Sequence, residues 1–220
     1  MSLPINIFIT ATDTDAGKTY IAAGLTKSLV SLGKRVAVYK PIAAGCEIVN
    51  GQLQNEDALL LQAASNAGQL YNAINPITFA EPIAPHIAAN KLNSPIDEDI
   101  ILAGYQALNG EINITEGAGG WRLPLGNRRY LSDFVKQIKP KVILVVNMKL
   151  GCLNHAILTY QSIVSDGLEC IGWIANNQVN MPYLKENIAE LSMLIDSPCL
   201  ASIQLHDDLL PATRNLLKLL

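Results

Sequence analysis

A glycine, a lysine and a threonine, Gly17-Lys18-Thr19, follow one another near the N-terminus, between a β-type apolar segment and a segment of helical periodicity. They match the second half of the phosphate-binding pattern G-x-x-x-x-G-K-[ST]. In that pattern glycine lets backbone amides approach phosphate, the lysine reaches the β- and γ-phosphates, and the hydroxyl binds Mg²⁺. The pattern's leading glycine would fall at Thr12, so its first half is missing. The alternative is a triplet that merely starts a helix, but the preceding strand favours nucleotide binding.

Three charged residues farther along the chain could complete such a site. Glu116 ends a strand-like segment and precedes Gly117-Ala118-Gly119-Gly120, whose glycines allow a ligand to approach the backbone closely. Asp57 could supply a second carboxylate for Mg²⁺, although alone it reads equally well as a favourable charge at a helix N-terminus. Lys40 could stabilise charge on a transferring phosphoryl group, or it could be a solvated loop residue. Taken by type alone, each of these residues also suits a structural role, which for Glu116 is a solvated acid before a turn, so residue types leave their function open.

The elements that must position these residues alternate between strand and helix. Runs of β-branched residues predict strands at 5–10, 35–39, 111–116, 141–147, 170–175 and 200–204. Segments with helical periodicity predict helices at 18–32, 56–67, 97–108, 154–164, 183–194 and 211–220. The region 68–94 is dense in prolines and is predicted to be irregular. The continuous apolar run 142–146 is typical of a parallel sheet covered on both faces. We therefore expect an α/β fold with three layers, a mostly parallel central sheet flanked by helices, over a single domain of residues 1–220.

Composition narrows the functional classes. The formal net charge of the 220 residues is -3, so nothing indicates binding to nucleic acid or to a membrane. The N-terminal residues lack the features of a signal peptide, and no apolar stretch approaches the ~20 residues of a membrane span. The four cysteines form no C-x-x-C pair, which suits reduced, packed thiols and a cytoplasmic protein.

The order of several motifs resembles that of dethiobiotin synthetases, from about residue 7 to residue 176. The matching stretches are Thr12-Asp13-Thr14-Asp15-Ala16-Gly17-Lys18-Thr19, Tyr39-Lys40-Pro41, Asp57-Ala58-Leu59, Thr78-Phe79-Ala80-Glu81-Pro82 with Pro85-His86, Glu116-Gly117-Ala118-Gly119-Gly120, Leu150-Gly151-Cys152-Leu153-Asn154-His155-Ala156 and Gly172-Trp173-Ile174-Ala175-Asn176. The series is far more specific than the phosphate-binding loop alone. It implies a P-loop NTPase fold.

The resemblance also implies a reaction, the ATP-dependent carboxylation and ring closure of 7,8-diaminopelargonic acid with CO2 (or bicarbonate as its source) to dethiobiotin in biotin biosynthesis. A substrate amine becomes a carbamate, which attacks the γ-phosphate to give a carbamic–phosphoric mixed anhydride. The second amine then closes the ring and releases phosphate. Members of the family use Mg²⁺ with ATP and act as homodimers with the substrate site at the subunit interface.

Carried over by position, the resemblance assigns a role to each matching residue. Lys40 and Lys18 are implied as catalytic, and Thr19, Asp57 and Glu116 as Mg²⁺ ligands. The implied nucleotide-binding residues are Asp15, Ala16, Gly17, Lys18, Thr19, Tyr20, Asp57, Glu116, Gly117, Ala118, Gly119, Asn176 and Asn177, with Asn176 reading adenine. The implied substrate-binding residues are Thr14, Lys40, Ala44, Gly151, Cys152, Leu153 and Asn154, the last four from the second subunit. Cys152 would act through its backbone, and neither His86 nor His155 is assigned a catalytic role.

The chain departs from the family pattern in three places. Ala11 stands where the family has the loop's leading glycine, so the loop is expected to be slightly tighter or shifted. Ala44 stands where a serine hydroxyl commonly contacts the substrate. The missing hydrogen bond is expected to cost ~1 kcal/mol of substrate-binding free energy unless another group or water replaces it. Residues 203–206 (Ile-Gln-Leu-His) replace a proline-bearing segment around the base, so the family pattern does not assign the nucleotide preference.

Two alternatives remain at this stage. A partitioning ATPase of the ParA/MinD type, or a relative of the nitrogenase iron protein, would carry an early lysine in G-K-G-G-x-G-K-T, where this chain has Thr12 and Asp13. A nucleotide sensor without turnover is supported only by Ala11 and Ala44, because a pure binder does not need the full set of lysines and carboxylates.

Overall fold

A six-stranded parallel sheet forms the centre of the protein in a computed structural model that describes residues 3–178 and 180–220. Its strands are β1 (Ile5–Ala11), β2 (Val36–Tyr39), β7 (Ile112–Glu116), β10 (Lys141–Asn147), β11 (Cys170–Asn176) and β12 (Cys199–Ile203). The spatial order is β12-β11-β10-β1-β7-β2, and all neighbours are parallel. Every residue of β11 is buried, as expected for a strand covered on both faces.

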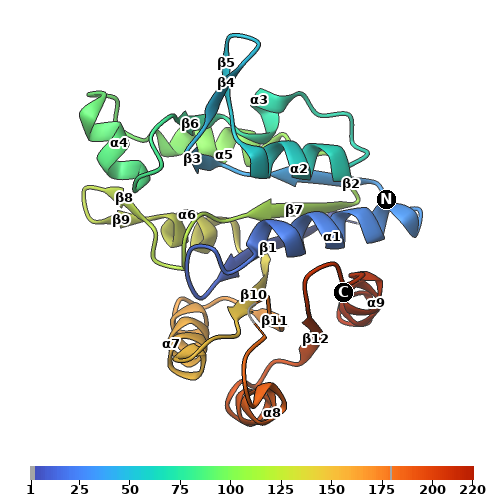
Figure 1. The fold of residues 1–220 in the computed structure, drawn as a ribbon. Coiled ribbons are helices and arrows are strands. Elements are labelled where there is room, and N and C mark those ends of the chain that lie inside the picture. The colour runs from blue at the N-terminus through green and yellow to red at the C-terminus, as the bar shows by residue number, and fades with distance from the viewer. Residues whose placement is uncertain (1–2, 179) are drawn as a thin grey trace.

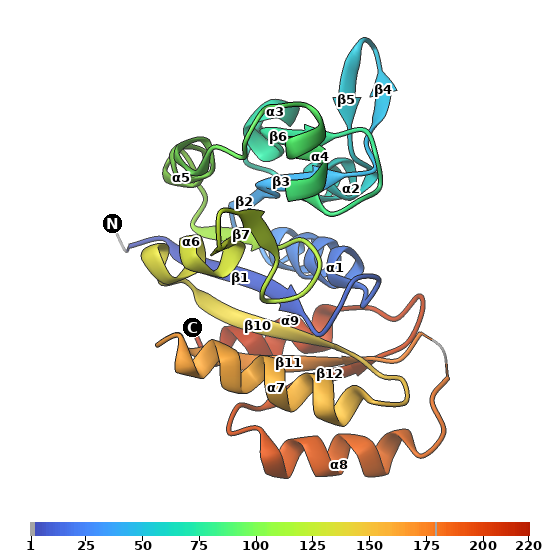
Figure 2. The same ribbon diagram turned by 90° about the vertical axis from the view of Figure 1, so that its left-hand side faces the viewer.

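Helices cover both faces of this sheet (Figure 1). They are α1 (Lys18–Ser31), α2 (Glu56–Ala64), α3 (Tyr71–Ile74), α4 (Pro85–Lys91), α5 (Glu98–Gln106), α6 (Leu131–Ile138), α7 (Cys152–Ser165), α8 (Leu184–Leu194) and α9 (Leu210–Leu217). Buried side chains of α1, α2, α3 and α9 form one core cluster with the sheet, and those of α4 to α8 form another. Figure 2 shows α6 and α7 on one side of the sheet and α1 and α9 on the other. The predicted three-layer α/β fold is confirmed.

The parallel arrangement brings the ends of several strands to one edge of the sheet. Ala11 ends β1 and leads into the phosphate-binding loop, and Lys40 directly follows β2. Glu116 ends β7, and Asn176 ends β11. Ligands of open α/β sheets bind at this carboxyl edge.

The predicted strands and the six predicted helices are all present, with ends that differ by at most three residues. Among the described residues, no helix combines the length and the apolar composition needed to cross a membrane.

The prediction that 68–94 is irregular was wrong. The region contains α3, strand β6 (Ile77–Phe79) and α4. Pro85 begins α4, a position where the missing proline N–H costs nothing. Strand β6 pairs with β3 (Ile42–Ala44), a partner that lies 35 residues earlier and leaves no local signal.

Other small elements were not predicted. They are α6 and two antiparallel hairpins, β4 (Glu47–Val49) with β5 (Gln52–Gln54), and β8 (Pro124–Gly126) with β9 (Arg129–Tyr130). The first hairpin projects from the molecule (Figure 2). Helix α6 does carry a signal, because Leu131, Phe134, Val135 and Ile138 recur at helical spacing.

Candidate functional site

The phosphate-binding loop turns sharply before α1. Gly17 has a φ of +83° in the left-handed region and directly precedes the helix. A Cβ at this position would lie 2.1 Å from Nδ2 of Asn176. A side chain is therefore disfavoured for two reasons, because the left-handed backbone conformation strains it and because Asn176 occupies the space that it needs. The Asn176 amide donates a hydrogen bond of 2.8 Å to the carbonyl of Ala16, and thereby holds the loop against the end of β11.

Gly17→Ala is therefore expected to weaken ATP binding at least tenfold, because the loop must move away from Asn176. Gly33→Ala is the matched control, since Gly33 has a φ of +79° and open space around it. Each substitution should destabilise the protein by about 1–2 kcal/mol through backbone strain. Calorimetric titration with ATP and thermal unfolding would separate the two effects. Equal ATP affinities for the two variants would contradict this account of Gly17.

Lys40 lies at the centre of a buried cluster of charges. Its Nζ is 2.8 Å from Oε1 of Glu116 and 3.0 Å from Oδ2 of Asp57. The hydroxyl of Thr19 donates a hydrogen bond of 2.8 Å to the same Glu116 Oε1. Glu116 is fully buried and Lys40 is 4% exposed. The structure therefore brings the first residue after β2, the last residue of β7 and the first turns of α1 and α2 into one cluster.

Opposite charges determine the protonation of this cluster. Burial alone would lower the pKa of Lys40, but the carboxylates of Glu116 and Asp57 outweigh it and raise that pKa. Burial alone would raise the pKa of Asp57, but Lys40 and the Thr19 hydroxyl lower it. Both groups are therefore charged at neutral pH.

The residues present fit a magnesium ion bound together with phosphate. Oε2 of Glu116 is buried and has no hydrogen-bond partner among the described residues, so this oxygen has capacity for a cation. Asp57 and the Thr19 hydroxyl add two further oxygens. No group of three or more His, Cys, Asp or Glu suited to a metal occurs in the described ranges. Mg²⁺ typically takes one or two carboxylates and completes its shell with water and phosphate, which this donor set suits.

Lys18 is the second buried lysine of the site. Burial, opposed by Glu116 and reinforced by Lys40, lowers its pKa to about 8. Its ammonium donates a hydrogen bond of 3.1 Å to the carbonyl of Asp13. Lys18 therefore begins to lose its charge at mildly alkaline pH.

ATP affinity is accordingly expected to fall above pH 8. Bound phosphates favour the protonated, charged form of Lys18. At a pH where Lys18 of the free protein has lost its proton, ATP binding must therefore be accompanied by proton uptake. The affinity should fall about tenfold per pH unit between 8 and 10. Calorimetric titration at pH 7, 8 and 9 would measure this, with Lys18→Met as the control that binds weakly at each pH. Equal wild-type affinity at pH 7 and 9 would contradict the prediction.

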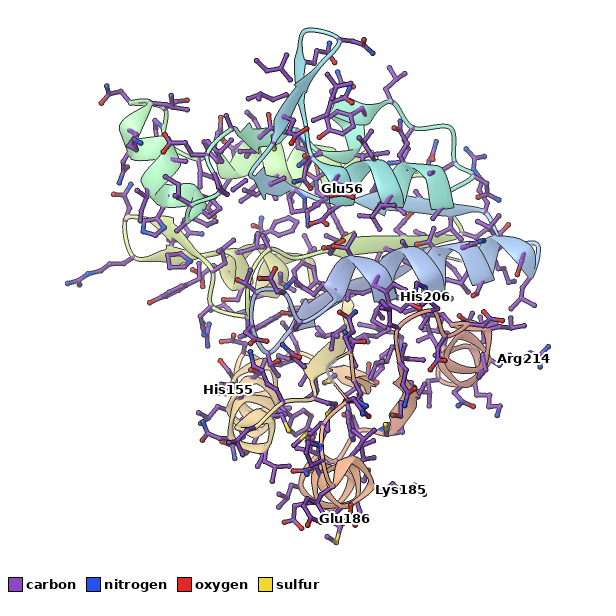
Figure 3. The ribbon with its side chains drawn as sticks, in the orientation of Figure 1. Glu56, His155, Lys185, Glu186, His206 and Arg214 are labelled. Carbon is purple, nitrogen blue, oxygen red and sulfur yellow. The ribbon has the colours of Figure 1, made fainter. Side chains whose placement is uncertain are left out.

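A cavity of about 840 Å³ connects the loop with the charged cluster. Many of the residues predicted from the sequence line it, namely Thr14, Asp15, Gly17, Lys18, Thr19, Lys40, Ala44, Asp57, Glu116, Ala118 and Gly119. Its wall also includes residues that the sequence analysis did not single out, namely Ile42, Ala43, Asn55, Ile83, Ala84, Leu123 and Gln178. Glu56, the neighbour of Asp57, marks the start of α2 in Figure 3.

Other predicted residues lie around the cavity without lining it. Ala16 is buried beneath the loop, and Gly117 donates its N–H to the carbonyl of Ile9 at 2.9 Å. The Tyr20 hydroxyl donates a hydrogen bond of 2.8 Å to the carbonyl of Asp207, which joins α1 to the segment after β12. Figure 3 shows His206 in that segment.

The two asparagines at the end of β11 face protein atoms. Oδ1 of Asn176 is buried without a partner among the described residues, and Oδ1 of Asn177 accepts a hydrogen bond of 2.8 Å from the Met181 amide. Of these two side chains, Asn176 is therefore the one whose amide oxygen has no partner among the described residues.

The segment Gly151–Asn154 forms the start of α7, away from the cavity. Gly151 has a φ of +93°, Cys152 is buried with a pKa raised by burial, and Leu150 before them is 96% exposed. His155, in the first turn of α7, lies at the surface in Figure 3.

The structure explains why alanine can stand at position 11, where the family pattern has glycine. Ala11 ends β1, pairs with Val145 of β10 and has no positive φ, so glycine is not required there. Ala44 is the last residue of β3 and faces the cavity without a polar side chain.

The sequence analysis missed an ion pair at the base of the loop. Nζ of Lys149, in the connection between β10 and α7, contacts Oδ2 of Asp13. Partial burial would raise the pKa of Asp13, but hydrogen bonds from Lys149 and Thr12 lower it. Asp13 stands in the loop already noted for its chemistry, whereas Lys149 lies outside the noted stretches, directly before Leu150.

Solved structures with a similar fold bind nucleotides. A plasmid partition protein from Borrelia burgdorferi bound to AMPPNP matches with a TM-score of 0.59 over 99% of this chain and 98% of that chain, at 11% identity. The septum site-determining protein MinD from Pyrococcus horikoshii, complexed with Mg-ADP, matches with a TM-score of 0.54 over 97% and 86%, at 17% identity. At these identities the likeness concerns the fold alone.

Sequence relatives are more specific. A family model described as an AAA domain matches residues 5–213. An ATP-dependent dethiobiotin synthetase BioD from Alteromonas mediterranea is 48% identical over 89% of this chain and 90% of its own length. Proteins of the same name from Pseudoalteromonas translucida (46%, covering 88% and 87%) and Pseudomonas aeruginosa (40%, covering 93% and 92%) also match. With such identity over nearly the whole length, and with the motifs gathered at one edge of the sheet, the chain belongs to the dethiobiotin synthetase family.

Proposed function

We propose that this protein catalyses the ATP-dependent carboxylation and ring closure of 7,8-diaminopelargonic acid with CO2 to dethiobiotin, ADP and phosphate. The observation that carries the proposal is the buried cluster of Lys40, Asp57 and Glu116 beside a phosphate-binding loop, in a chain of this family. A nucleotide sensor has no need of a buried lysine held between two carboxylates. Phosphoryl transfer needs both the positive charge and the metal-binding oxygens.

In the proposed reaction a substrate amine takes up CO2 as a carbamate, and a carbamate oxygen attacks the γ-phosphorus. Lys18 and Lys40 both line the cavity, so their ammonium groups can stabilise the negative charge that develops on the phosphoryl group. ADP leaves, and the second amine then attacks the carbonyl carbon of the mixed anhydride. Ring closure expels phosphate, so one ATP is consumed per ring.

Thr19, Asp57 and Glu116 would hold Mg²⁺. When bound, Mg²⁺ neutralises charge on the phosphate oxygens. Lys40 contacts both carboxylates, so a metal held by the same two side chains would share them with its ammonium. Its ammonium would then be available to the transferring phosphoryl group.

The remaining roles follow the family pattern. Asp15, Ala16, Gly17, Tyr20 and the stretch Gly117–Gly119 would surround the phosphates and ribose, and Asn176 with Asn177 would contact the base. Thr14 and Ala44 would contact the diamine. The substrate carboxylate would bind the segment 151–154 of a second subunit in a homodimer, where the N-terminus of α7 favours an anion.

The test is phosphate release from ATP with Mg²⁺ and bicarbonate, with and without diaminopelargonic acid, while dethiobiotin is followed by mass. Product formation stoichiometric with phosphate supports the proposal. Phosphate release indifferent to the diamine would indicate another P-loop ATPase, and ATP binding without turnover would indicate a sensor. Replacing ATP by other nucleoside triphosphates in the same assay determines base preference.

A further inference from the structure

Lys149 connects two parts of the active-site edge that are far apart in the sequence. It lies in the short connection between β10 and α7, and its side chain forms the ion pair with Asp13 described above. Its backbone carbonyl accepts a hydrogen bond of 2.9 Å from the amide of Cys152, in the first turn of α7. The side chain of Lys149 is 42% exposed and that of Asp13 is 26% exposed, so the pair is partly shielded from water.

The contacts of Asp13 lead directly to Lys18. While the Asp13 carboxylate binds Lys149, its backbone carbonyl accepts the hydrogen bond from Nζ of Lys18. Lys18 is only 7% exposed, and its ammonium makes no other hydrogen bond among the described residues. The position of Asp13 therefore determines where the Lys18 ammonium lies when phosphate arrives.

Few other contacts fix the start of the loop, where Asp13 lies. The family's leading glycine is absent, and the stretch precedes α1, so helical hydrogen bonds do not hold it. Thr12 is anchored by two hydrogen bonds to β10, from its amide to the Val145 carbonyl at 3.1 Å and from the Asn147 amide to its hydroxyl at 3.2 Å. The Thr12 hydroxyl donates a hydrogen bond of 3.0 Å to Oδ1 of Asp13, and the ion pair with Lys149 ties the other carboxylate oxygen of Asp13 to the connection between β10 and α7.

We infer that Lys149 is a positioning residue for phosphoryl transfer, which acts by holding Asp13 so that the Asp13 carbonyl orients the Lys18 ammonium. The expected effect of Lys149 on turnover rests on the proposed function. Its expected effect on ATP affinity does not, because ATP binding can be measured whatever the reaction. Lys149 does not touch the cavity and has no direct contact with the nucleotide in this account.

The test compares Lys149→Met, Asp13→Asn and the double variant with wild type. Each single variant should weaken ATP binding and lower kcat about three- to tenfold, while the KM for the diamine stays within twofold. The double variant should be no worse than either single one, since both remove the same ion pair. Lys149→Arg should recover most of the ATP affinity because the charge is retained.

Lys34→Met is the matched control. Lys34 has a similar exposure of 43% and pairs with Glu111 at 3.9 Å, so its loss should leave ATP affinity unchanged. Additive losses in the double variant, or wild-type ATP affinity in Lys149→Met, would overturn the inference. Absence of dethiobiotin formation by the wild type would instead refute the proposed function and leave the binding comparison valid.

Discussion

Lys40→Met is expected to lower kcat by a factor on the order of 10²–10³, the cost typical of removing one group that stabilises developing charge. The same substitution should lower the free energy of unfolding by about 3 kcal/mol, because Glu116 would keep a buried charge without its cation. Methionine preserves much of the side-chain volume, so packing contributes little to either effect. Turnover by product mass and unfolding in urea would measure the two separately.

Lys91→Met is the control for Lys40→Met. Lys91 pairs with Glu81, but both side chains are more than half exposed, so stability should change by less than about 1 kcal/mol. Wild-type turnover in Lys40→Met would remove this lysine from the reaction. Wild-type stability would show that Glu116 finds another partner when Lys40 is absent.

Glu116→Gln is expected to reduce turnover about 100-fold or more while ATP affinity changes only a few-fold. Glutamine is nearly isosteric and can still accept the hydrogen bond from Thr19, but it removes the negative charge offered to Mg²⁺. The backbone of the phosphate loop, which supplies much of the nucleotide affinity, is left intact. Steady-state kinetics and calorimetric titration with ATP, each over a range of Mg²⁺ concentrations, would separate turnover from binding.

Glu111→Gln provides the comparison, because Glu111 directly precedes the strand β7 that Glu116 ends. Glu111 is exposed and pairs loosely with Lys34, so its replacement should affect neither turnover nor binding. Turnover of Glu116→Gln equal to that of Glu111→Gln would remove Glu116 from the metal site.

The large elements were predictable because their physical causes are local. The β-branched residues at 5–10 predicted a strand, and the apolar run at 142–146 predicted a strand buried on both faces. The parallel order then brings Glu116 and Lys40 to one edge. Contacts between distant residues left no such signal. The pairing of β6 with β3, the ion pair of Asp13 with Lys149 and the hydrogen bond from Asn176 to Ala16 each depend on the assembled fold. The dimer and the roles in nucleotide and substrate binding stay predictions.

The contact of the Lys40 ammonium with both carboxylates bears on the order in which ligands bind. A divalent ion that enters alone finds Oε1 of Glu116 and Oδ2 of Asp57 already paired with a buried cation, although Oε2 of Glu116 has no partner among the described residues. The ligand-free protein should therefore be a poor chelator, indifferent to free Mg²⁺ or Ca²⁺ and to EDTA. A polyphosphate that arrives with the metal would supply the remaining metal ligands and would give the Lys40 ammonium other anionic oxygens to bind. Metal and nucleotide should consequently enter as one species.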